Sequence, residues 1–201
     1  KEKRSRYDQF GHAADGMGSG MGGSGGGTSF FGLSSSGSRF CYIVDVSGSM
    51  QQQERLPSAI AELTNSLKRL PDFARFYVLF YSSQVREDIP SMQKGWNTAR
   101  SITIRRMTKE FKNVRANGGT RPFPAFEKAL ALKPTPEVIF FLTDGEVSGF
   151  TVEMLRDLIP KGTRVVVNTI AFGNSASQQQ MIDIAKATGG QYKFVQSGNA
   201  P

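Results

Sequence analysis

Cysteine, histidine and long apolar runs are almost absent from this 201-residue chain. The one cysteine, Cys41, excludes an intramolecular disulfide, and its place within an apolar run is typical of a small buried side chain. The one histidine, His12, precedes a glycine-rich stretch, which excludes a Ser–His catalytic pair within a folded domain further along. No stretch approaches the roughly 18 apolar residues of a transmembrane helix, so no membrane span is expected.

Carboxylates are outnumbered, since 17 acidic residues stand against 25 basic ones and the net charge is +8. Such a charge is compatible with nucleic acid, a membrane surface or an acidic protein as partner, and does not choose among them. No signal peptide is visible, because the opening Lys-Glu-Lys-Arg is not followed by an apolar core. Together with the lack of disulfides this favours the cytoplasm, or an envelope or extracytoplasmic location if a signal or anchor lies upstream.

The composition changes sharply near residue 36. From position 16 to position 32, nine of 17 residues are glycine, which is typical of a flexible linker. We therefore expect a flexible, basic and glycine-rich tail over 1–36, one domain over 37–197 and a short C-terminal tail over 198–201. Residues 18–23 match the spacing of a dinucleotide-binding loop, but no strand precedes them and no helix follows them, so the match is attributed to chance.

Strand and helix patterns alternate from Arg39 onward. Compact apolar runs predict buried strands over 39–46, 74–81, 138–143, 164–171 and 191–195. A short strand around 85–89 is expected to form a hairpin at the sheet edge. Helical spacing predicts helices over 56–70, 96–112, 152–159 and 177–188, and another that begins at residue 122. Alternating strands and helices imply a mostly parallel sheet with helices on both faces, and such sheets bind ligands beyond the carboxyl ends of their strands.

Oxygen-bearing side chains follow two of these strands. Asp45, Ser47 and Ser49 come at the end of the first strand, and Asp144 directly follows the strand over 138–143, while Thr120 lies on a glycine loop between them. Alternate positions can converge on one point once the chain turns. Two carboxylates and three hydroxyls suit a hard cation such as Mg²⁺, with Mn²⁺ or Ca²⁺ as alternatives. Because hydroxyl ligands are neutral, the cation would stay electrophilic and favour a carboxylate from another protein.

These three segments, in this order, resemble the metal-ion-dependent adhesion site (MIDAS) of von Willebrand factor A (VWA) domains, and the resemblance spans residues 37–197. It implies a doubly wound, Rossmann-like three-layer sandwich, with a mostly parallel six-stranded sheet, one antiparallel edge strand and helices on both faces. It also implies direct metal contacts from Ser47 and Ser49, direct or water-mediated contacts from Thr120 and Asp144, and an anchoring role for Asp45. The expected ligand is an exposed Asp or Glu of a partner protein.

The rim of the expected site carries further candidates. Arg121 stands where family members often have an acidic or amide residue. The candidate partner contacts are Arg121, Gln51, Gly119 and Glu146. Residues 100–121 contain seven basic side chains and one acidic side chain. This charge has two interpretations, which are a solvated helix face and a patch that steers an acidic partner toward the site.

Competing functions are less well supported by the residues. Residues 3–14 resemble the end of a J domain and its Gly/Phe linker, so one alternative is an adaptor with an upstream J domain, although the His-Pro-Asp signature is absent. A phosphatase of the haloacid dehalogenase type would need a second aspartate where Ser47 stands. Nucleic-acid binding lacks an aromatic platform beside the basic residues. We therefore predict a monomeric, non-enzymatic and metal-dependent protein-interaction module.

Overall fold

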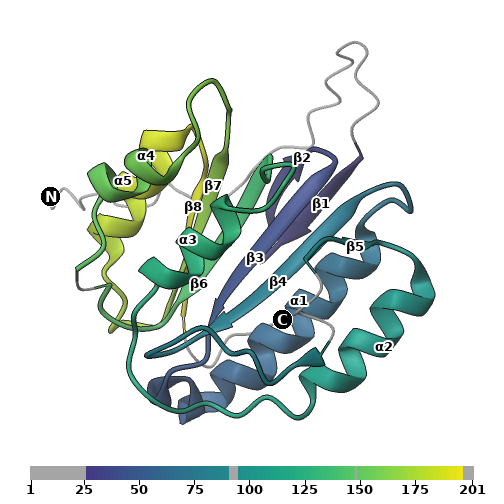
Figure 1. Ribbon diagram of the computed structural model, residues 1–201. Helices are drawn as coiled ribbons and strands as arrows, with labels where there is room; N and C mark the ends of the chain where they lie inside the picture. Colours follow the sequence, from purple (N-terminus) through teal and green to yellow (C-terminus); the bar gives the residue numbers. More distant parts are fainter. Residues whose placement is uncertain (1–25, 91–94, 148, 197–201) are drawn as a thin grey trace, which may run out of the picture.

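A six-stranded sheet forms the centre of the computed structural model, which describes residues 26–90, 95–147 and 149–196. The strand order is β5-β4-β3-β6-β7-β8, and all neighbours are parallel except β4 and β5 (Figure 1). The strands span β3 Arg39–Asp45, β4 Arg75–Tyr81, β5 Asn97–Thr98, β6 Val138–Thr143, β7 Val166–Phe172 and β8 Tyr192–Val195. This confirms the predicted doubly wound sheet with one antiparallel edge strand.

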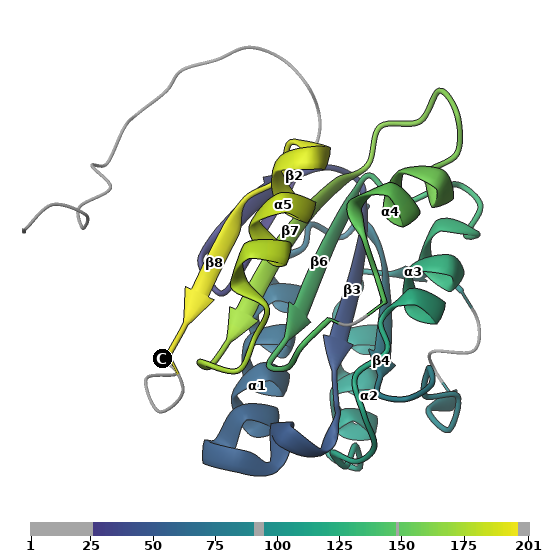
Figure 2. The same ribbon diagram turned by 90° about the vertical axis from the view of Figure 1, so that its left-hand side faces the viewer.

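Helices cover both faces of the sheet. One face carries α1 and α2, and the other carries α3, α4 and α5 (Figure 2). The helices span α1 Arg55–Arg69, α2 Ser101–Phe111, α3 Phe123–Leu130, α4 Val152–Leu158 and α5 Gln178–Thr188, and the 3₁₀ helix η1 spans Gly48–Glu54. No helix in the described ranges is long and apolar enough to cross a membrane.

Burial on both faces explains the continuous apolar runs of the central strands. Successive side chains alternate between the faces, so Phe140 packs toward α1 while Phe141 packs toward α3. Cys41 is fully buried in the core between the sheet and helices α3, α4 and α5. Burial raises the pKa of its thiol well above the ordinary value. The thiol therefore acts as a small apolar side chain.

The edge of the sheet differs from the prediction. The antiparallel edge strand is β5, whereas the expected strand over 85–89 is reduced to a single bridge between Val85 and Tyr81. The helix expected from residue 96 begins only at Ser101, because the backbone before it pairs with β4, where Ala99 N donates to Ala74 O at 2.9 Å. Helical spacing alone could not show that this segment is used as an edge strand.

The expected tail over 1–36 is wrong for residues 27–36. There the chain forms an antiparallel hairpin of β1 Gly27–Phe30 and β2 Leu33–Ser36, whose turn residues Phe31 and Gly32 have φ of 49° and 78°. Phe30, Phe31 and Leu33 are buried in the α1-side core, where the Phe30 ring meets the ring of Phe140. Two phenylalanines therefore override the glycine-rich composition. The J-domain-like residues 3–14, the glycine loop over 18–23 and the tail over 198–201 lie outside the described residues.

Candidate metal centre

The candidate site lies where the strand order reverses, between β3 and β6. The chain proceeds from β3 to β4 on one side and returns to β6 on the other side of β3. In the paired register Val44 is opposite Leu142, so Asp45 and Asp144 leave the sheet at the same carboxyl edge. Crevices at such switch points are the usual ligand sites of open α/β sheets.

Asp45 is fully buried and held by three donors. Ser47 N donates to its Oδ1 at 2.7 Å, and Thr143 Oγ1 and Tyr81 OH donate to its Oδ2 at 2.7 and 3.3 Å. Burial raises the pKa of Asp45 to about 6, the hydrogen bonds from Ser47 and Thr143 counteract this, and the nearby Asp144 carboxylate raises it further. A cation beside this group would favour its ionised form.

The Ser47 and Ser49 hydroxyls converge on Asp144. Ser49 Oγ donates to Asp144 Oδ1 at 2.7 Å, and Ser47 Oγ lies 3.4 Å from the same oxygen and 3.1 Å from Ser49 Oγ. Asp144 is fully buried, whereas Ser49 is only half-buried. Three oxygen atoms from two separate segments thus form one compact group beside Asp45.

Arg55, the first residue of α1, is a site residue that the sequence analysis missed. Its Nη1 lies 2.8 Å from Asp144 Oδ2, and its side chain is only 7% exposed. Asp144 therefore turns Oδ1 to the serines and Oδ2 to a guanidinium. Gln53 and Glu54 have φ of 50° and 56°, a break that separates η1 from α1. No sequence motif pointed to this arginine, because the contact depends on how the chain bends before the helix.

The glycine loop over 118–120 is hydrogen-bonded to the start of η1 and to the segment that follows β4. Gly48 N donates to Gly118 O at 2.9 Å, and Gly119 N donates to Ser83 Oγ at 2.8 Å. Thr120 Oγ1 lies 3.0 Å from the position a Cβ on Gly145 would occupy, so this hydroxyl rests against the residue that follows Asp144. The structure therefore brings Thr120 to the same edge as the other expected ligands.

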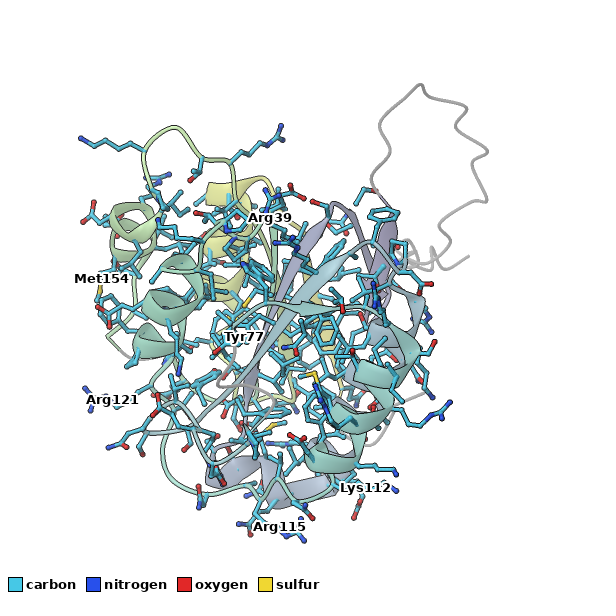
Figure 3. All side chains as sticks on the ribbon, turned by 45° about the vertical axis from the view of Figure 1, so that its right-hand side comes forward. Arg39, Tyr77, Lys112, Arg115, Arg121 and Met154 are labelled. Atoms are coloured by element: carbon cyan, nitrogen blue, oxygen red, sulfur yellow. The ribbon has the colours of Figure 1, made fainter. Side chains whose placement is uncertain are left out.

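The four expected rim residues are all exposed. Gln51 Nε2 donates to Ala116 O at 2.7 Å and braces the neighbouring loop. Arg121 donates its backbone N–H to Ser82 O at 2.9 Å, while its side chain extends at the margin of the molecule (Figure 3). Across the described ranges, no ion pair or hydrogen bond joins the Arg121 guanidinium or the Glu146 carboxylate to the five expected ligands.

The chemistry of this donor set fits a divalent cation. The buried charges of Asp45, Asp144 and Arg55 sum to −1 (−1 − 1 + 1), and buried negative charge is costly without a counter-ion. In the part of the chain that the structure describes, no group of three or more His, Cys, Asp or Glu side chains could hold a metal ion. A cation here would therefore depend on hydroxyl oxygens as well as carboxylates, which suits a hard ion such as Mg²⁺.

Fold and site together define a doubly wound α/β domain with an oxygen-rich cluster of side chains at its switch point. The family model of the von Willebrand factor type A domain matches residues 39–194, and the chain belongs to this family. Domains of this family are generally metal-dependent protein-interaction modules. The match does not include residues 3–14, so the J-domain adaptor gains no support from it. No curated protein matches the chain.

Several solved structures share the fold. A von Willebrand factor type A protein from Catenulispora acidiphila aligns with TM-score 0.67 and 19% identity over 82% of this chain and 40% of that chain. The ArnB paralog VWA2 from Sulfolobus acidocaldarius aligns with TM-score 0.61 and 17% identity over 80% of this chain and 41% of that chain. Proximal thread matrix protein 1 from the mussel byssus, in a structure whose MIDAS motif is occupied by zinc, aligns with TM-score 0.61 and 20% identity. The alignment covers 80% of this chain and 42% of that chain. The chain thus spans about two fifths of each of these structures.

Proposed function

We propose that this domain captures an acidic side chain of a partner protein through a divalent cation held by Asp45, Ser47, Ser49, Thr120 and Asp144. The observation that carries the proposal is the convergence of Ser47 Oγ, Ser49 Oγ and Asp144 Oδ1 within 3.4 Å, beside the buried Asp45. Membership of a family of metal-dependent interaction modules supports it. So does the zinc-occupied MIDAS motif of the mussel byssus protein, which shares the fold.

Each residue has a distinct role in this proposal. Ser47 and Ser49 supply neutral oxygens, Asp144 supplies one negative oxygen, and Thr120 completes the set from the glycine loop. Asp45 holds the Ser47 backbone N–H and thereby orients the loop that carries both serines. When bound, the cation supplies an electrophilic centre for a carboxylate. We favour Mg²⁺, and Mn²⁺ or Ca²⁺ suit the same oxygen donors.

The proposal assigns binding and no catalysis. Serine nucleophiles need a neighbouring base, and the only histidine of the chain, His12, lies outside the described residues. We propose Gln51, Gly119, Arg121 and Glu146 as the rim that meets the partner, because all four are exposed around the loops of the site. The functional unit is proposed to begin at the hairpin, at residue 27, rather than at residue 37.

Calorimetric titration with MgCl₂ and with MnCl₂ tests the cation site. We expect saturable binding by the wild type and a loss of affinity of at least roughly tenfold in Asp45→Ala, since removal of an orienting carboxylate typically costs this much. Asp157→Ala, an exposed aspartate on α4, is the matched control and should bind like the wild type. Absence of saturable binding by the wild type, or an unchanged response in Asp45→Ala with a native circular dichroism spectrum, would disprove the proposal.

A further inference from the structure

A second concave surface, remote from the candidate metal centre, lies between α1 and α2. These two helices lie side by side on one face of the sheet (Figure 1). The groove between them has a volume of about 450 Å³ and is lined by the end of α1 and by one side of α2. Arg55 and Lys68 are at opposite ends of α1, so at 1.5 Å per residue the two sites are about 20 Å apart. We call this surface the α1–α2 groove.

Positive charge dominates the α1–α2 groove. Its walls carry Lys68, Arg105, Lys109 and Lys112, against the single carboxylate of Asp72. Arg105 and Lys109 of α2 and Lys112, its C-cap residue, are spaced by four and three positions, which places them on one side of the helix. Throughout the described ranges, none of the four basic side chains takes part in an ion pair or a hydrogen bond. Among the residues that the structure describes, the groove therefore presents positive charge that no ion pair neutralises.

Apolar side chains accompany this charge. Leu70, Ala99 and Ile104 are buried beneath the groove and form part of its lining. Phe73 and Ile102 are the exposed large hydrophobic residues of the described chain, at 58% and 69% exposure. Each directly follows a lining residue in the sequence, Asp72 and Ser101, so the backbone of both lies next to the groove. Exposed apolar side chains that gather around a concave surface indicate an interaction site.

We propose that the α1–α2 groove binds an acidic, amphipathic segment of a protein partner, independently of any cation. Carboxylates of that segment pair with the four basic side chains, and its apolar residues cover Phe73 and Ile102. Charge complementarity selects an anionic partner. The apolar residues favour a peptide over nucleic acid, because single-stranded nucleic acids are held by aromatic stacking platforms, and no aromatic side chain is among the described residues that line the groove. A concave site also suits an inserted chain better than a flat lipid surface.

Fluorescence anisotropy with a labelled peptide of alternating Glu and Leu pairs at helical spacing tests this proposal. The triple charge reversal Lys68→Glu, Arg105→Glu and Lys109→Glu should weaken binding by roughly tenfold or more. The matched control reverses three exposed basic residues beyond the opposite face of the sheet, Arg156→Glu, Lys161→Glu and Arg164→Glu, and should retain wild-type affinity. A second variant with Gln at the same three groove positions keeps the test valid if the charge-reversal variant does not fold. It should weaken peptide binding by a smaller factor than the charge reversal does.

Four results would overturn the proposal. Equal weakening in both triple reversals would mean that only net charge matters, and unchanged binding in the groove variants would mean that the groove is not the site. Tighter binding of a single-stranded oligonucleotide or of phosphatidylserine vesicles than of the peptide would assign the groove to another kind of partner. Binding should persist in EDTA and in Asp45→Ala. If it is lost there but kept in the groove reversal, the peptide binds at the metal centre, and the groove proposal fails while the cation site stands.

Discussion

The contact between Arg55 and Asp144 gives the candidate metal centre an internal cation. Because the Arg55 guanidinium occupies the Oδ2 side of Asp144 and is almost fully buried, it offsets one of the two buried carboxylates in the protein without metal. The same positive charge would repel a divalent ion at the Oδ1 side of Asp144, because like charges repel each other more strongly in the protein interior than in water. Arg55 is therefore expected to have opposite effects on the stability of the fold and on cation affinity.

Arg55→Gln is expected to separate these two effects. Loss of one partner of a buried pair costs about 3–5 kcal/mol, so thermal melts in EDTA should show a strongly destabilised protein. Calorimetry should show Mg²⁺ affinity raised by roughly tenfold, because the repulsion is removed. Arg156→Gln is the control, since Arg156 is exposed on α4, and neither quantity should change much. Weaker Mg²⁺ binding by a folded Arg55→Gln protein would show that the arginine supports the site rather than opposing the ion.

At the scale of an element, the glycine loop over 118–120 adopts a left-handed backbone conformation at Gly118, which glycine permits without strain. Gly118 has φ of +77°, and a Cβ there would lie 3.0 Å from Ser83 Oγ. Its carbonyl accepts from Gly48 N, within the turn that presents Ser47 and Ser49. A change in this loop should therefore reach both the Thr120 segment and the serine segment.

Gly118→Ala is expected to destabilise the fold by about 1–2 kcal/mol, the usual cost of a left-handed conformation for a residue with a Cβ. It should also weaken Mg²⁺ binding, because the displaced loop carries Thr120. Gly162→Ala is the matched control, since Gly162 has φ of +76° but no atom within 4 Å of a Cβ. It should lose similar stability in urea denaturation and keep its cation affinity. Equal Mg²⁺ affinities for the two variants would argue against a role of this loop at the site.

At the scale of the whole molecule, the N-terminal hairpin acts as part of the domain core. It covers the α1 side of the sheet over β6 and β7, where Phe31 packs on Phe172 and Asn168 Nδ2 donates to Ser35 Oγ at 3.3 Å. The family match begins only at residue 39, after the hairpin. A fragment cut to the family boundary would expose the aromatic surface that the hairpin buries.

Removal of residues 1–36 should lower the free energy of unfolding by about 5 kcal/mol or more, since burial of each large apolar side chain contributes about 1.5–3 kcal/mol. A chain that begins at Gly26 keeps the hairpin and should unfold like the full chain. Phe30→Ala tests the same point in an intact chain, with an expected loss of about 3–5 kcal/mol, and the exposed Ser36→Ala should change little. Equal urea midpoints for the 37–201 fragment and the full chain would show that the hairpin is dispensable.

The sequence by itself determined the order of the strands β3, β4, β6, β7 and β8 and predicted where the candidate site would lie. Apolar runs such as that of β6 can be recognised locally, because strands buried on both faces must be apolar throughout. Oxygen-bearing residues at the ends of β3 and β6 then had to meet, since parallel strands share a carboxyl edge. Asp45, Ser47 and Ser49 could be located from spacing alone, because short turns join them.

Only the tertiary structure decided the contacts between segments far apart in the chain. The Arg55–Asp144 pair joins residues 89 positions apart, and Phe30 meets Phe140 across the sheet. The α1–α2 groove likewise depends on how two helices pack. Periodicity describes which way a side chain points on its own element, but it carries no information about which other element lies opposite. For that reason composition predicted a linker where two phenylalanines build a hairpin, and no pattern marked the arginine that pairs with Asp144.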